Sequence, residues 1–175
     1  MLRPTPRRKT FMQENTLAIY LNDHLAGSVM AIELLEHMEE DDGASPAPQR
    51  SLRDLRLKIT ADQEILRALL DSLSSNESTV KKAGAWIMEK VARAKTKPTK
   101  PKTGGLGALE AFEILSLGIE GKKCLWKVLA EVMPQPARPQ WHWRELIEDA
   151  DRQRREVEAW RIQAARRAFL ETEAT

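Results

Sequence analysis

The chain has 175 residues, of which 42% are hydrophobic and 31% charged, and its formal net charge is +2. These values are typical of one helix-rich domain with a real core, and they exclude the strongly basic composition of many nucleic-acid-binding domains. No apolar segment is long enough to span a bilayer or follows the basic N-terminus as in a signal peptide. With a single cysteine, Cys124, no intrachain disulfide can form, which fits a cytoplasmic protein.

The N-terminal part predicts a basic tail followed by a long helix. Residues 1–9 are basic and contain prolines, so we expect a disordered tail ahead of one helical domain over residues 10–175. Thr10 and Gln13 form a capping-box pattern, which places the start of the first helix near Phe11 and its end near Glu40.

Two polar residues interrupt the apolar face of this helix. At about 100° per residue, that face collects Leu17, Leu21, Leu25, Ile32 and Leu35. His24 and Ser28 fall near its middle, whereas His37 falls on the opposite side. We therefore predict an interior His24 and an exposed His37.

The second helix, expected from an N-cap at Ser51 to about Ser74, carries a matching interruption. Asp62 lies on the face formed by its leucines and Ile59. In an antiparallel hairpin that pairs Met38 with about Arg50, His24 comes level with Asp62. The sequence thus predicts a His24–Asp62 hydrogen bond with Ser28 nearby. Two interpretations stay open. In the first, these residues form a satisfied polar layer that fixes the register of the helices, and in the second they form a ligand or metal site.

The remaining chain predicts three further helices. A short helix over Ser78–Ala94 is followed by a lysine- and proline-containing connection, an apolar helix over Leu106–Met133 and a last helix over His142–Glu171. Cys124 is expected to be a small core residue. We also hypothesise that Gly118 and Gly121 contact Gly27.

Charged residues near the interior of these helices are expected at the edge of the bundle. Glu113 and Glu120 share a stripe with lysines, so a salt-bridged, exposed edge is favoured over a paired-carboxylate site. Arg154 and Arg161 are placed at an edge as well.

These helices together predict an all-α fold, a ferritin-like up-and-down bundle of four long helices plus one short helix. The segments YLNDHLAGS, KKAGAWIMEK and LSLGIEGKKCLW also resemble a bacterial family of helical-bundle proteins with the pattern LNDHLAG, AWxxEK and LGxxGKxxLW. The resemblance spans about residues 17–130 and includes His24, Asp62 and Trp126. It implies a ferritin-like bundle and a cytoplasmic compartment, and it implies no chemistry.

Motif searches favour a non-catalytic interaction or structural protein over an enzyme. The chain has no Glu-x-x-His, so the usual di-iron site of ferritin-like proteins is absent from the sequence, and it has no recognisable hydrolase, phosphate-loop or zinc motif. A protein partner or self-association could use Trp141, Trp143 and Trp160 as an apolar anchor, although these residues would equally well cap the core. The alternative is a metal-binding protein with a reduced, non-di-iron site at His24, Ser28 and Asp62. Nucleic acid is disfavoured because acidic residues alternate with the arginines of the last helix.

Overall fold

The structure, a computed structural model, describes residues 6–40, 45–73, 105–133 and 141–170, with side chains described from Asn15 onward. Four helices account for most of these residues: α1 (Pro6–Glu40), α2 (Gln49–Leu73), α4 (Gly105–Val132) and α5 (Trp143–Leu170). The described ranges contain no strand, which confirms the all-α class. The short helix predicted over Ser78–Ala94 lies outside the described residues, so the described helices number four and not five.

Helix boundaries agree with the sequence best in the C-terminal half. α4 and α5 begin and end within one residue of the predicted positions. α1 begins at Pro6 rather than at Phe11, so the helix includes residues 6–9. Proline suits the first helical position, because its missing N–H would have no partner there.

The start of α2 also differs from the prediction. The backbone N–H groups of Ser51 and Leu52 both donate to the carbonyl of Pro48, at 2.9 and 3.1 Å. Ser51 therefore lies inside the first turn and does not cap it. Ser45 instead orders the approach to the helix, since its Oγ accepts a hydrogen bond from the N–H of Ala47 at 3.1 Å.

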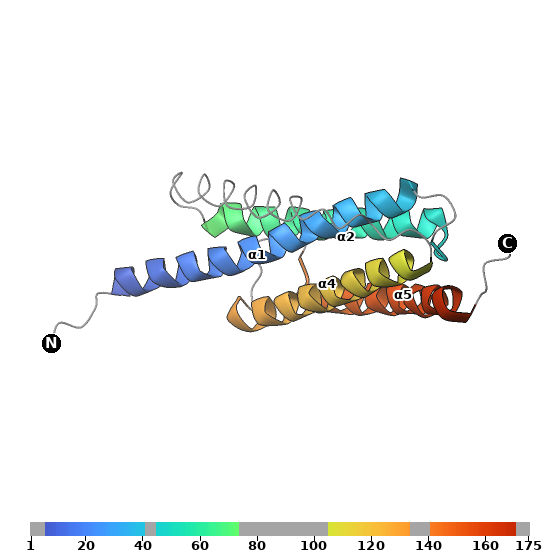
Figure 1. The fold of residues 1–175 in the computed structure, drawn as a ribbon. Helices are drawn as coiled ribbons and strands as arrows, with labels where there is room; N and C mark the ends of the chain where they lie inside the picture. Colours follow the sequence, from blue (N-terminus) through green and yellow to red (C-terminus); the bar gives the residue numbers. More distant parts are fainter. Residues whose placement is uncertain (1–5, 41–44, 74–104, 134–140, 171–175) are drawn as a thin grey trace.

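The helices form two antiparallel pairs, α1 with α2 and α4 with α5 (Figure 1). α2 and α4 run in the same direction, so the ends that residues 74–104 connect lie at opposite ends of the bundle (Figure 1). The contacts between α4 and α5 are the most extensive, and α1 also packs against α4. None of the helices in the described ranges has the length and apolar content needed to cross a bilayer.

Aromatic side chains fill the core between α4 and α5. Trp126 and Phe112 are completely buried. Trp126 stacks on Trp143 with 6.1 Å between ring centroids, and Phe112 contacts Trp160 at 5.8 Å. Trp141, Trp143 and Trp160 are all buried, so these tryptophans belong to the core and the proposed apolar anchor is wrong. The burial of Trp143 and Trp160 follows from the α4–α5 pairing, in which Trp143 Nε1 also donates to the carbonyl of Met133 at 2.7 Å.

The glycines do not form the predicted contact between α1 and α4. A Cβ atom added at Gly27, Gly118 or Gly121 would meet nothing within 4 Å, because these positions lie on open helix surface. Among these four glycines, Gly105 is the one where a close approach requires glycine. A Cβ there would lie 2.9 Å from the backbone of Ala168, where the start of α4 meets the end of α5.

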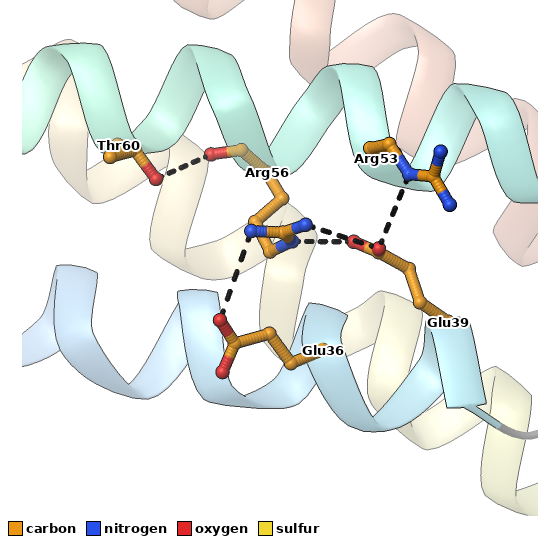
Figure 2. A network of polar contacts seen from close by, with 5 residues as sticks. All are labelled: Glu36, Glu39, Arg53, Arg56 and Thr60. Atoms are coloured by element: carbon orange, nitrogen blue, oxygen red, sulfur yellow. Dashed lines mark hydrogen bonds and ion pairs between the residues drawn. The ribbon is translucent and has the colours of Figure 1, made fainter.

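An ion-pair network joins the end of α1 to the start of α2 (Figure 2). Arg56 donates two hydrogen bonds to Glu39, at 2.6 and 3.2 Å, and its guanidinium also lies 3.8 Å from Glu36. The hydrogen bond to Glu39 raises the pKa of Arg56, and the more exposed Arg53 approaches the same carboxylate at 3.8 Å. The two-pronged contact holds the hairpin in one register.

Candidate functional site: a buried polar layer

An ion pair between Asp62 and Lys122 crosses the centre of the bundle. Lys122 Nζ donates to Asp62 Oδ2 at 2.5 Å, which joins α2 to α4. The two side chains are only 13% and 12% exposed, so both charges lie largely outside water. Burial lowers the pKa of Lys122, and the attraction of Asp62 opposes that shift. A buried ammonium ion requires such a partner, because an unpaired charge in a low-dielectric interior is costly.

Polar residues from the other two helices complete the layer. Lys122 Nζ also donates to Gln153 Oε1 of α5 at 2.5 Å. Next to Asp62 on α2, Gln63 Nε2 donates to Ser28 Oγ of α1 at 2.9 Å, and Ser28 in turn donates to the carbonyl of Leu25. We call Ser28, Asp62, Gln63, Lys122 and Gln153 the polar layer. Every described helix contributes to it, and Asp62, Gln63 and Gln153 are buried.

His24 does not belong to this layer, and its predicted hydrogen bond to Asp62 is absent. Among the described residues, Asp62 pairs with Lys122 instead. The Ser28–Gln63 contact places His24 more than one helical turn from the height of Asp62. His24 is half-buried and packs edge-to-face on Tyr20, with 4.8 Å between ring centroids. Burial lowers its pKa, an effect that the nearby Asp23 opposes.

The sequence contained a signal for the layer residues that the prediction missed. Lys122 follows Ile119 by three positions and precedes Trp126 by four, which is the spacing of the inner face of α4. Gln153 has the same relation to Ala150 and Val157 on α5. The helical periodicity that predicts Asp62 on the inner face of α2 therefore also predicts Lys122 and Gln153 on the inner faces of α4 and α5. A buried lysine at the same height as a buried aspartate indicates an ion pair.

Glu113 and Glu120 of α4 lie at a salt-bridged edge, as predicted, and α5 forms the other side of that edge. Glu113 pairs with Arg161 at 3.3 Å, and Glu120 pairs with Lys123 and Arg154 at 2.7 and 3.3 Å. The hydrogen bond from Lys123 lowers the pKa of Glu120. The edge position predicted for both arginines is therefore confirmed.

Cys124 is exposed, so its expected place in the core is wrong. It follows Gly121 and Leu117 on the outer side of α4, away from the inner stripe that includes Ile119, Trp126 and Leu129. The prediction failed because α4 is apolar on two sides, and hydrophobicity alone does not identify the side that packs.

The layer offers an anchored positive charge rather than a set of metal ligands. Its titratable groups are one carboxylate and one ammonium ion, and the ammonium nitrogen occupies the position beside Asp62 Oδ2 that a bound cation would need. Across residues 15–40, 45–73, 105–133 and 141–170, no three His, Cys, Asp or Glu side chains converge in a way that could hold a metal ion.

Comparisons with protein-family models, with curated proteins and with solved structures give no match to this chain.

Proposed function

We propose that this protein is a non-catalytic helical bundle that binds a protein chain through the outer side of α4. In this proposal the polar layer is structural and fixes how the four helices pack. One observation carries the proposal, which is the row of exposed apolar residues along α4.

We call this row the α4 outer stripe and define it as Ile114, Leu117, Gly121, Cys124, Val128 and Val132. Successive members are three or four residues apart, so they share one side of the helix. Ile114, Leu117 and Val132 have branched apolar side chains, yet they are 57%, 75% and 58% exposed. A continuous apolar stripe in water is typical of an interaction surface, whereas scattered apolar residues are not.

The polar layer supports a structural role because its charges satisfy each other. The Lys122 ammonium group has an acceptor on α2 and another on α5, and Ser28 and Gln63 bond to each other. A buried ion pair is a weak source of stability but specifies one register, since any shift of a helix separates the partners. Metal binding at His24, Ser28 and Asp62 receives no such support, because Lys122 already neutralises Asp62.

The ferritin-like class and the cytoplasmic location stay proposals. The two antiparallel helix pairs, with α2 and α4 parallel, support the ferritin-like arrangement (Figure 1). The resemblance of YLNDHLAGS and LSLGIEGKKCLW to a bacterial bundle family supports the same class. Neither argument assigns an activity.

A photo-crosslinking residue at position 117 tests the binding role directly. Leu117→p-benzoylphenylalanine in the intact chain is expected to give a discrete covalent adduct with a protein in the cells that produce it. The matched control is the same replacement at Leu57, an isolated apolar residue of α2 that is 56% exposed, where we expect no discrete adduct. Absence of any adduct at position 117, or equal adducts at both positions, would refute the proposed function.

A further inference from the structure

The α4 outer stripe is arranged similarly on both sides of Gly121. Ile114 lies seven residues before this glycine and Val128 lies seven residues after it, so both return to the same side of the helix after two turns. Leu117 and Cys124 fill the turns between them. A second α4 helix that runs antiparallel would therefore place Ile114 of one copy level with Val128 of the other.

Gly121 has no explanation within the described part of the chain. A glycine inside a helix is less favourable than alanine by about 1 kcal/mol. A Cβ atom at this position would meet nothing within 4 Å, so none of the described helices that pack beside α4 excludes it. The bare backbone at the centre of an apolar stripe is suited to close approach by another helix. Leu117, the most exposed member of the stripe, lies one turn before this gap and comes level with Leu125 of a second, antiparallel copy.

Charges beside the stripe agree with an antiparallel pairing about Gly121. Glu113 lies eight residues before the glycine and Lys127 six residues after it, so opposite charges of the two copies come within one turn of each other. Both side chains are exposed, although Glu113 also pairs with Arg161 of its own chain at 3.3 Å. The contact extends over about four helical turns, from Ile114 to Val128.

We propose that the α4 outer stripe binds a second copy of this chain, in an antiparallel α4–α4 contact centred on Gly121. This inference rests on the proposed function, because it names the partner of the same surface. A contact of four helical turns is small beside the roughly 800 Å² per partner of a stable complex. The dimer is therefore weak and depends on protein concentration.

Sedimentation velocity on the purified chain tests this contact. The mass should rise from the monomer value of 19.9 kDa toward twice that value as concentration increases. Gly121→Leu and Leu117→Glu should each weaken association by about tenfold or more, because one fills the point of closest approach and the other places charge on it. Leu57→Glu on α2 should leave association unchanged. Circular dichroism should show that all three variants keep the helical fold.

The single cysteine gives an independent readout of the same surface. Cys124 lies three residues from the proposed axis, so its thiol should react with a maleimide at low concentration and be protected as the dimer forms. A strictly monomeric protein overturns the inference, whether Cys124 reacts freely or is protected by another part of the same chain. Association that Gly121→Leu does not weaken also overturns it. An adduct at position 117 with a different protein, without self-association, refutes this inference and leaves the proposed function standing.

Discussion

Removing the charge of Lys122 tests whether the polar layer is as buried as the structure shows. Lys122→Met keeps most of the side-chain volume and leaves the Asp62 carboxylate, 12% exposed, without its charged partner. Breaking a buried pair in this way is expected to destabilise the fold by about 3–5 kcal/mol. Loss of the Gln153 contact contributes to this value, because the amide oxygen loses its donor at 2.5 Å. Urea denaturation followed by circular dichroism measures the change in the free energy of unfolding.

The double variant Asp62→Leu, Lys122→Met separates pairing from packing. It removes both charges, so its free energy of unfolding should lie within about 1–2 kcal/mol of wild type or above it. The matched control is the exposed pair Glu64–Arg67 on the next turns of α2, with side chains 61% and 47% exposed. Truncating either member of that pair should change stability by about 1 kcal/mol or less.

Two results would refute this reasoning. If Lys122→Met were as mild as the Glu64–Arg67 control, water would have to reach Asp62 and the layer would not be buried. If the double variant were as unstable as Lys122→Met alone, the two residues would not compensate each other. In either case the layer could not be the element that sets the helix register.

Three further predictions concern residues outside the layer. Burial lowers the pKa of His24 below 6.5, so the unfolded chain takes up the proton first as the pH falls, and stability should fall as the pH drops through 6.5 toward the folded-state pKa. In urea denaturation, His24→Gln should therefore lose less stability than wild type between pH 7.5 and pH 5. Parallel pH profiles of the two proteins would contradict this. Arg56→Ala should destabilise the fold by about 1–2 kcal/mol, because it removes a two-pronged, partly buried contact with Glu39. The Arg53 side chain is 66% exposed, so Arg53→Ala should change stability by about 0.5 kcal/mol or less. Equal losses of stability in thermal melts of the two variants would contradict the geometry. Gly121→Ala should raise the stability of the monomer by about 0.5–1 kcal/mol. Gly105→Ala should lower that stability, because the added Cβ atom meets the α5 backbone. Stability changes of the same sign in denaturation experiments on the two variants would contradict these predictions.

The sequence predicted the elements whose signals are local. Glycine, proline and apolar spacing place α4 and α5 to within one residue, and winding the helices places Ser28 and Asp62 inside. The pairing partner of Asp62 depends on how far α1 and α2 are displaced along each other. One turn of error moved the predicted partner to His24, and no pattern within α1 or α2 reports that displacement.

The missed residues show a second limit of sequence reasoning. Lys122 sits beside Lys123, and a pair of lysines suggests a solvated face, but one turns inward to Asp62 and the other reaches the edge at Asp151. Cys124 shows the opposite error, since it precedes the apolar residues Leu125 and Trp126 yet lies in solvent. For a helix with two apolar sides, only the positions of the neighbouring helices decide which side is buried.

The polar layer also bears on the order in which the chain folds. The α1–α2 pair and the α4–α5 pair each have extensive contacts between their own two helices. The Arg56–Glu39 contact lies entirely within the α1–α2 hairpin. Lys122 and Asp62, by contrast, are 60 residues apart and join one hairpin to the other. Docking the two hairpins one turn out of register would leave the charges of Asp62 and Lys122 unpaired in an apolar interior. Such misdocked compact states are therefore less stable than they would be if the interface between the hairpins were entirely apolar. We therefore expect the ion pair to act late in folding, when the hairpins dock. Its contribution should appear in the rate at which correctly docked hairpins form, and not in the helix content that the chain reaches before docking.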